Sequence, residues 1–374
     1  MIMKLEEEYL VRKGILHIKP YIPGKPAEEV KRELGLHDVI KLASNENPLG
    51  PSPLAIKAIK HAVDQIHIYP DAESYELRNA VSELLGVSPD HLIFGNGGEE
   101  IVTLIGKAFI NEGERCIIPH PVYDAYETVV RIMGGVVCFS ELTEYRINLN
   151  DMFRKVNEKT KLVFICNPMN PTGTIVTQEE LDAFLQKIPS GTVVVLDEAY
   201  CHFVSDAGYP DGIDYVKQGR NVIVLRTFSK VYGLAGIRIG YGVAKPGLIR
   251  LIWQVKEPFN VNVLAQMGAL AALRDHEHLE RTISLIHRER VFLYGELSDM
   301  GLKYIHTETN FILINVEVDV TVVFQRILES GIIVRPGDIW GLPHLIRLTI
   351  GTREQNKLFI KTLRDVLQFQ NFST

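Results

Sequence analysis

Six short runs of apolar residues, rich in Val and Ile, recur between residues 91 and 228, and a helical or turn segment separates each run from the next. They are 91–94, 115–119, 135–140, 161–166, 192–197 and 221–228. Continuous apolar strands that alternate with helices are typical of a mostly parallel sheet with helices on both faces. We therefore predict an α/β fold, in which ligands bind at the carboxyl ends of the strands.

A second, smaller unit is predicted from the rest of the chain. Because 374 residues are too many for one small core, two domains are expected. Helical spacing occupies 258–297, and strand-like segments follow at 310–316, 331–336 and 344–350. We predict a large domain over 46–270 and a small α+β domain formed by both termini, 1–45 and 271–374.

The composition argues against several classes of function. The chain has 40 basic and 46 acidic residues and a formal charge of −6, without the basic stripe that binds nucleic acid. No apolar run approaches the ~20 residues that span a bilayer, and the charged first residues do not resemble a signal peptide. Scattered cysteines favour reduced thiols in a cytoplasmic protein and no metal site. They are Cys116, Cys138, Cys166 and Cys201.

The segment 226–241, RTFSKVYGLAGIRIGY, carries a lysine just after an apolar strand. Lys230 has small, non-acidic neighbours, and in a positive or apolar setting a lysine amine loses its proton more easily and attacks a carbonyl. Thr227, Ser229 and Arg238 add two hydroxyls and a forked cation, which suit a phosphate group. The competing interpretation is an ordinary surface lysine on a Gly-rich loop.

Asp197 ends another apolar strand, in VVVLDEAY, where a carboxylate is costly unless a partner meets it. A buried acid can pair with a protonated ring nitrogen, because an opposite charge shifts a pKa by ~1–3 units. A pyridoxal ring needs that pairing to act as an electron sink, and Tyr200 is close enough to reach the phenolic oxygen of such a ring. The alternative, a metal-binding acid of the Walker B type, is weakened because the chain contains no G-x-x-x-x-G-K-[ST] loop.

Two further strand ends carry polar groups. In FICNPMNPTG two Asn-Pro steps predict a rigid turn that directs the amide of Asn170 into the cleft, although an ordinary turn is an equal alternative. In HLIFGNGGEE a strand, a glycine loop and a helix start bring Gly97, Gly98 and Glu99 to a helix N-terminus, where backbone amides bind phosphate. Tyr123, in HPVYDAY, is able to stack on a flat ring, but a lone tyrosine more often belongs to the core.

Two arginines lie on the strand-like segments near the C-terminus. Arg335 is in GIIVRPG and Arg347 in HLIRLTIGT. Such a pair can hold a carboxylate or phosphate with forked hydrogen bonds. The alternative is a solvated arginine on an edge strand.

The order and spacing of these segments carry a resemblance to a known family along nearly the whole chain. The segments are NENPLG, YPD, GNGGEE, PVYDAY, NPMNPTG, DEAY, SKVYGLAGIRIGY and IRLTIGT. Together they resemble the fold-type-I, class-II aminotransferases that depend on pyridoxal 5′-phosphate (PLP). Within that family the chain is most similar to the histidinol-phosphate aminotransferases, through PYIPGKP, LASNENPLGPSP and EPFNVNVLAQ. The resemblance implies a large domain with a mostly parallel seven-stranded sheet and a smaller α+β domain.

The resemblance also implies a role for each residue. Lys230 holds the cofactor covalently and moves the substrate proton, Asp197 pairs with the pyridine nitrogen, and Tyr123 stacks on the ring. Asn170 and Tyr200 contact the phenolate oxygen. The phosphate of the cofactor is held by Gly97, Gly98, Glu99, Thr227, Ser229, Arg238 and, from the other subunit of a homodimer, Tyr69.

For the substrate, the resemblance implies that Arg347 binds the carboxylate of glutamate. Arg347 with Arg335, Tyr21 and Asn45 would bind the phosphate of histidinol phosphate. The expected reaction interconverts L-histidinol phosphate and 2-oxoglutarate with imidazole acetol phosphate and L-glutamate in histidine biosynthesis. Three alternatives stay open: an aromatic-amino-acid aminotransferase, a threonine-phosphate decarboxylase of the same fold, and a cofactor-binding regulator. No residues are assigned to an imidazole pocket from the sequence.

Overall fold

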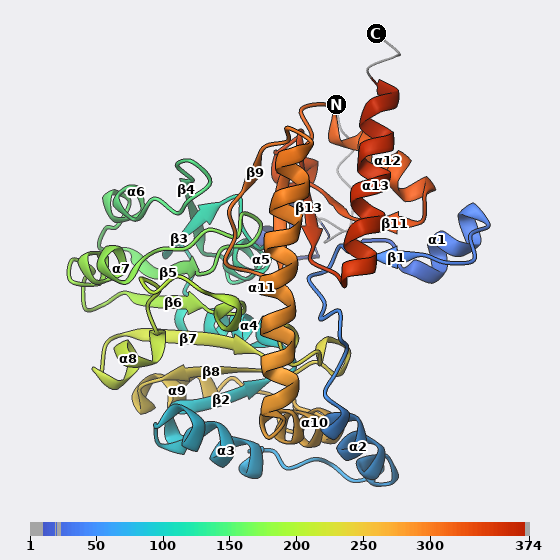
Figure 1. Cartoon of the computed structure of the whole chain (residues 1–374). Helices are drawn as coiled ribbons and strands as arrows, with labels where there is room; N and C mark the ends of the chain where they lie inside the picture. The colour runs from blue at the N-terminus through green and yellow to red at the C-terminus, as the bar shows by residue number, and fades with distance from the viewer. Residues whose placement is uncertain (1–9, 19, 21–23, 371–374) are drawn as a thin grey trace.

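The structure, a computed structural model, describes residues 10–18, 20 and 24–370, and its largest element is a seven-stranded sheet (Figure 1). The strands are β2 (Leu92–Gly95), β3 (Arg115–His120), β4 (Val136–Glu141), β5 (Thr160–Cys166), β6 (Val193–Asp197), β7 (Val222–Thr227) and β8 (Gly240–Ala244). They lie in the order β2-β8-β7-β6-β5-β3-β4. β8 is antiparallel to both of its neighbours, and the remaining pairs are parallel. The predicted α/β fold is therefore confirmed.

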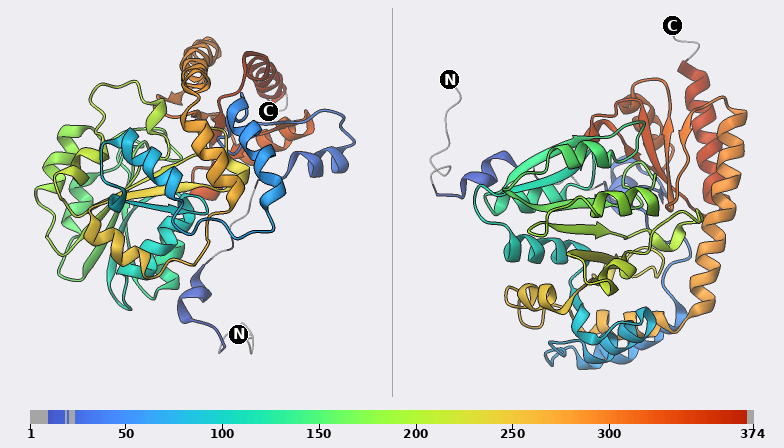
Figure 2. Two further views of the ribbon diagram at one scale, coloured as in Figure 1. Left: turned by 90° about the horizontal axis from the view of Figure 1, so that it is seen from below. Right: turned by 90° about the vertical axis from the view of Figure 1, so that its left-hand side faces the viewer.

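Helices cover both faces of this sheet (Figure 2). On one face lie α4 (Gly98–Phe109), α5 (Ala125–Ile132) and α9 (Pro246–Trp253), and on the other α6 (Leu149–Arg154), α7 (Gln178–Leu185) and α8 (Gly212–Lys217). Along β5, Val163 and Ile165 belong to one apolar cluster, whereas Leu162 and Phe164 belong to the other. Because both faces are covered, apolar residues occupy successive positions, and this explains the continuous runs in the sequence.

β8 was not among the predicted strands. Its sequence, GYGVA, contains two glycines, which are disfavoured in strands. Gly240 is required by a close approach, since a Cβ atom there would lie 2.6 Å from the backbone nitrogen of Gly98. The tight packing of β8 on the start of α4 therefore outweighs its poor strand preference.

A smaller antiparallel sheet lies beside the large one. It consists of β9 (Tyr304–Ile305), β10 (Phe311–Asn315), β12 (Arg335–Pro336) and β13 (Leu345–Thr349), in the order β12-β13-β10-β9. β1 (Ile40–Lys41) pairs in parallel with β11 (Ile332–Ile333), so segments from both ends of the chain meet here. Helices α1 (Ala27–Leu34), α12 (Val320–Glu329) and α13 (Arg353–Gln370) pack around these strands. The domain boundaries at 46 and 270 stay a prediction.

The helical stretch predicted at 258–297 forms two helices, α10 (Val263–Leu273) and α11 (His276–Asp299). The break is at Asp275, whose side chain accepts from the backbone N–H of His278 and begins α11. α11 runs along the side of the molecule past both sheets, while α2 (Pro53–Ala62) packs on α10 and α3 (Tyr75–Leu85) lies beside them (Figures 1 and 2). The 3₁₀ helices are η2 (Lys13–His17), η3 (Val63–Gln65), η4 (Pro89–His91), η5 (Cys201–Phe203), η6 (Ala235–Ile237) and η7 (Asp338–Trp340).

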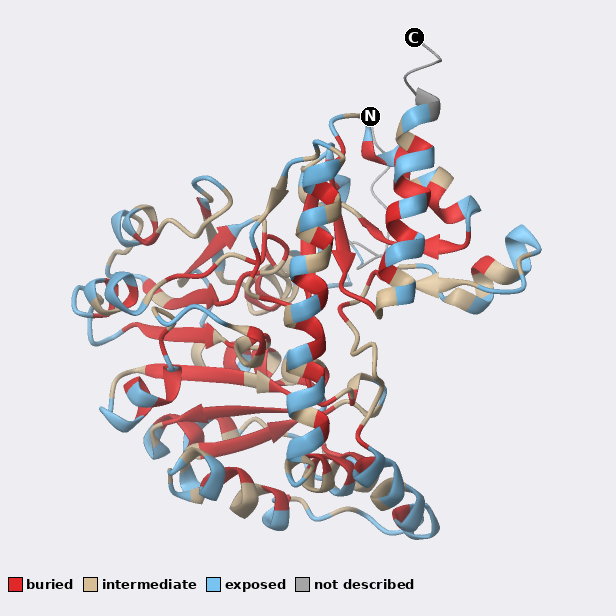
Figure 3. Cartoon of the chain, in the orientation of Figure 1, coloured by how far each residue is buried: buried red, intermediate tan, exposed pale blue. Residues whose placement is uncertain are grey.

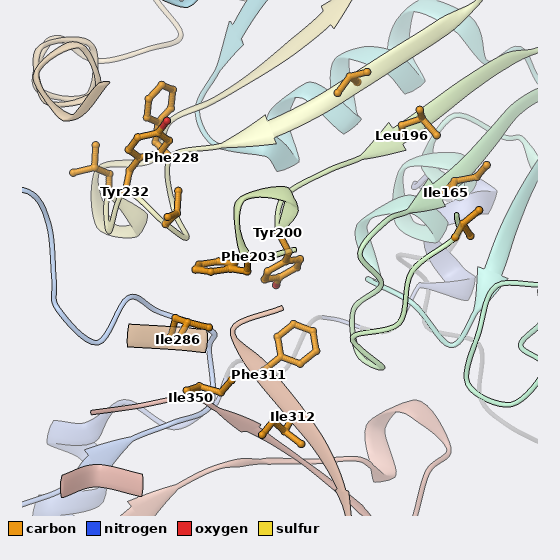
Figure 4. Packing of buried hydrophobic residues seen from close by; sticks show 14 of the residues in the cluster. Ile165, Leu196, Tyr200, Phe203, Phe228, Tyr232, Ile286, Phe311, Ile312 and Ile350 are labelled. Carbon is orange, nitrogen blue, oxygen red and sulfur yellow. The ribbon is translucent and has the colours of Figure 1, made fainter. Parts of the chain in front are cut away.

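One apolar core joins the two sheets. Burial is concentrated on the strands and on the inner faces of the helices (Figure 3). Tyr200, after β6, meets Phe311 of β10 edge to face, with ring centroids 5.2 Å apart (Figure 4). This contact brings the small sheet against the carboxyl ends of the large-sheet strands. Among the helices that the structure describes, none has the length and apolar character needed to cross a membrane.

Candidate active site

A cavity of about 320 Å³ lies where the carboxyl ends of β5, β6 and β7 face the smaller sheet. This is the edge of an open α/β sheet at which ligands are expected. The predicted residues that line it are Asn45, Gly98, Glu99, Tyr123, Asn170, Asp197, Tyr200, Thr227, Ser229, Lys230, Arg238, Arg335 and Arg347. Residues from widely separated stretches of the chain therefore converge on one space.

Lys230 is one of the residues that line this cavity. Its Nζ donates to the carbonyl oxygen of Ser44 at 3.2 Å and lies 5.6 Å from the centre of the Tyr200 ring. Burial lowers the pKa of Lys230 to about 8, and the positive charge of Arg347 adds to the effect. An amine with such a pKa is uncharged more often than an ordinary lysine at neutral pH, and the uncharged form is the nucleophile.

Asp197 closes β6 on the floor of the cavity. Its Oδ1 accepts from the backbone N–H of Ala199 at 3.0 Å, and its Oδ2 accepts from the hydroxyl of Tyr126 at 2.5 Å. Burial raises the pKa of Asp197, while the hydrogen bond from Tyr126 opposes that rise. The carboxylate is suited to a cationic partner, because a buried charge is stabilised by an opposite one.

The N-terminus of α4 forms an anion cup at another end of the cavity. No side chain caps this helix, so its first backbone N–H groups have no side-chain acceptor. Gly97, at φ +85°, lies directly behind the cavity wall, and a Cβ atom there would lie 2.4 Å from Nη2 of Arg238. With the hydroxyls of Thr227 and Ser229 in the same wall, the cup provides the donors and the helix dipole that bind phosphate.

Arg335 and Arg347 are directly opposite each other in the antiparallel register of β12 and β13, so their side chains lie on the same face of the small sheet. The guanidinium of Arg347 lies between the rings of Phe311, at 5.2 Å, and Trp340, at 4.9 Å. Its Nη2 donates to the carbonyl oxygen of Ala43 at 2.8 Å. Like charges directly opposite each other repel, and a bound anion would relieve that repulsion.

Two amides are hydrogen-bonded to other site residues. Asn170 accepts from Nη1 of Arg347 at 2.5 Å. Asn45, which is buried at φ +56°, donates to the hydroxyl of Tyr200 at 2.9 Å. The structure therefore places Asn45 on the Tyr200 side of the cavity. Burial raises the pKa of Tyr200, and its phenol stays protonated near neutral pH.

Two of the predicted residues that the structure describes, Gly97 and Tyr69, are not among those that line the cavity. Tyr69 is 80% exposed and stacks on Phe259, with ring centroids 4.8 Å apart. Tyr21 lies outside the described residues. Within the part of the chain that the structure describes, no group of three or more His, Cys, Asp or Glu side chains is placed to hold a metal ion.

The sequence interpretation missed several contributors to the site. Tyr126 lies in the first turn of α5, and its position in the sequence is that of an ordinary core tyrosine, so no pattern singled it out. Ser44 acts through its backbone carbonyl, for which no side-chain pattern exists. Trp340 lines the cavity from η7, whose short length gives no periodicity to detect.

Comparisons with known proteins agree with this geometry. A family model described as "Aminotransferase class I and II" matches residues 37–363. The chain is 49% identical to the histidinol-phosphate aminotransferase of Moorella thermoacetica, over 95% of this chain and 92% of that protein. It is 47% identical to histidinol-phosphate aminotransferase 2 of Carboxydothermus hydrogenoformans, over 96% and 99%. The crystal structure of the Sinorhizobium meliloti histidinol-phosphate aminotransferase with pyridoxal-5′-phosphate superposes with a TM-score of 0.87 at 28% identity, over 95% and 98% of the two chains.

Proposed function

Since the chain belongs to the class I and II aminotransferases, we propose that it transfers an amino group between L-histidinol phosphate and 2-oxoglutarate. The products are imidazole acetol phosphate and L-glutamate, and the reaction is a step of histidine biosynthesis. The observation that carries the proposal is the pair Arg335 and Arg347, which offers two forked cations on one wall of a cavity that also holds a buried lysine.

The cavity fits pyridoxal 5′-phosphate. The uncapped start of α4 and Arg238 suit the phosphate, and the ring of Tyr123 suits the pyridine ring. Asp197 suits a protonated pyridine nitrogen, while Asn170 and Tyr200 offer donors toward the phenolate oxygen. When bound, this cofactor carries the amino group and acts as an electron sink.

Lys230 is the residue that we assign to the covalent link and to proton transfer. Its lowered pKa increases the fraction of uncharged amine. The amine donates to the Ser44 carbonyl and lies near the ring of Tyr200, inside the cavity. In the reaction, Nζ of Lys230 would take the proton from the substrate carbon that bears the amine and would deliver it to the C4′ carbon of the cofactor. The hydroxyl of Tyr200 accepts from Asn45 and so directs its own hydrogen elsewhere in the cavity.

The two arginines explain how one site serves two differently shaped substrates. Glutamate brings a carboxylate and histidinol phosphate brings a phosphate, and a forked guanidinium binds either anion. Phe311, Trp340 and the Ala43 carbonyl fix the position of the Arg347 guanidinium before a substrate arrives. Such preorganisation lowers the entropic cost of binding.

A substrate panel on the PLP-loaded protein tests the proposed specificity. The absorbance of the lysine-bound cofactor should be lost rapidly on addition of histidinol phosphate and recovered with 2-oxoglutarate. Loss with phenylalanine alone would favour the aromatic-amino-acid aminotransferase instead. Release of carbon dioxide from threonine phosphate, without any need for 2-oxoglutarate, would favour the decarboxylase.

We also propose a homodimer with a shared site in the cytoplasm. Large apolar side chains of α2, η3 and the segments beside them are exposed, and they include Leu54, Ile56, Val63, Ile66, Ile68, Tyr69, Phe259 and Met267. A surface of this kind is typical of an interface, and a second copy of the chain is the expected partner. Tyr69 would then reach the phosphate cup of the partner. The four free cysteines are consistent with a reducing compartment.

A further inference from the structure

Tyr126, in the first turn of α5, is fully buried with 0% exposure. Its ring stacks on Phe164 of β5, with centroids 4.8 Å apart and planes at 16°. A second aromatic neighbour is Tyr123, which meets it edge to face with ring centroids 5.7 Å apart. The phenol is thus fixed between the strand layer and Tyr123, the tyrosine proposed to stack on the cofactor ring.

The hydroxyl of Tyr126 donates to Oδ2 of Asp197. The other oxygen, Oδ1, accepts from the backbone N–H of Ala199, so each carboxylate oxygen has one donor from the protein. A carboxylate oxygen accepts two hydrogen bonds, and one position on each therefore remains for a ligand. The two protein donors fix the plane of the carboxylate at the floor of the cavity.

Burial raises the pKa of both groups, with different consequences for their hydrogen bond. It raises the pKa of Tyr126 well above that of an ordinary tyrosine, so the phenol stays a donor at any working pH. It also raises the pKa of Asp197, which disfavours the carboxylate, and the strongest opposing influence is the hydrogen bond from Tyr126. Without that bond a larger fraction of Asp197 would be protonated, and a protonated acid is a poor partner for a pyridinium.

We propose that Tyr126 is a positioning residue that orients the Asp197 carboxylate toward the pyridine nitrogen of PLP and preserves its charge. The inference rests on the binding of PLP in this cavity and not on the identity of the amine substrate. Tyr126 is not among the residues that line the cavity, whereas Asp197 is, so Tyr126 would act on the cofactor through Asp197.

Titration of the cofactor-free protein with PLP, followed by absorbance, tests the inference without any amine substrate. Tyr126→Phe keeps the ring and its packing and removes one hydrogen bond to a charged group, so PLP affinity should fall about tenfold. Tyr215→Phe is the matched control, because Tyr215 is a buried tyrosine of α8 that does not line the cavity. The control should bind PLP as the unaltered protein does.

A double-mutant cycle separates positioning from packing. In the Asp197→Asn background, Tyr126→Phe should change PLP affinity less than twofold, because the charge on which Tyr126 acts is gone. Equal losses in both backgrounds would overturn the proposal and leave Tyr126 a packing residue. An undiminished affinity for the single variant would also overturn it. Circular dichroism and melting temperature identify any variant that does not fold, and Tyr126→Leu, which also removes the hydroxyl donor but has a smaller side chain, then replaces it in the same cycle.

Discussion

Arg347 and Asn170, which are 177 residues apart in the chain, are joined by a hydrogen bond of 2.5 Å from Nη1 to Oδ1. Arg347 belongs to the small sheet, and Asn170 follows β5 of the large one. The same guanidinium donates a hydrogen bond to the carbonyl oxygen of Ala43. The residue proposed to bind the substrate anion is therefore connected to an amide proposed to contact the cofactor, so substrate binding and cofactor contacts are expected to influence each other.

Arg347→Lys should lower kcat/KM about 100-fold for both glutamate and histidinol phosphate. Lysine keeps the charge but loses the planar fork and the stacking between two aromatic rings, and charge-assisted forked bonds are worth several kcal/mol together. Steady-state kinetics with each substrate measures the effect. Arg364→Lys, an exposed arginine paired with Glu296 on the surface, is the control and should change neither value. A normal kcat/KM for both substrates in Arg347→Lys would remove Arg347 from the substrate site.

In the cofactor-free protein, Lys230 should react with an amine reagent at a rate that rises about tenfold per pH unit and levels off near pH 8. The pKa of Lys230 is lowered because burial and the positive charge of Arg347 both favour the uncharged amine. Peptide mapping by mass spectrometry gives the rate at this lysine. Arg347→Gln removes one repelling charge, so the pKa rises and the plateau moves to higher pH. A plateau that stays in place in Arg347→Gln would show that Arg347 does not influence the amine.

Gly97→Ala should weaken PLP binding and lower stability by about 1–2 kcal/mol, because an alanine at φ +85° is strained and its Cβ meets the Arg238 guanidinium. Melting temperature and PLP titration check the two effects. Gly191→Ala is the matched control, since a Cβ atom there meets nothing within 4 Å. If the variant and the control behave alike, the contact between Gly97 and Arg238 does not shape the phosphate cup.

The sequence predicted the large sheet well because its strands are buried on both faces. Runs such as 161–166 and 192–197 have apolar residues at successive positions, as expected for strands that helices cover on both faces. The residues at the strand ends were predicted for a related reason. A polar side chain such as Asp197, at the end of an apolar strand, requires a polar or charged partner. Because the carboxyl ends of parallel strands meet at one edge of the sheet, such side chains are expected to gather there around a ligand.

The remaining features depend on contacts that no local pattern contains. β8 forms because its glycines allow a close approach to α4. Asn45 meets Tyr200 across 155 residues, and the Ser44 carbonyl meets Lys230 across 186. Tyr126 has the same residue type and helical spacing as an ordinary core tyrosine, and only its distance to Asp197 distinguishes it.

The last prediction concerns Tyr69, whose 80% exposure leaves it available to a partner. In a symmetric dimer each site would combine Lys230 of one subunit with Tyr69 of the other. Tyr69→Ala and Lys230→Ala should each be poorly active alone, but a mixed dimer of the two contains one unaltered site. Random mixing in equal amounts should then restore about a quarter of the original activity, since half of the dimers are mixed and each has one working site. Native mass spectrometry confirms that mixed dimers form. If they form without any gain of activity, Tyr69 does not serve the partner's site, and the shared-site dimer is wrong.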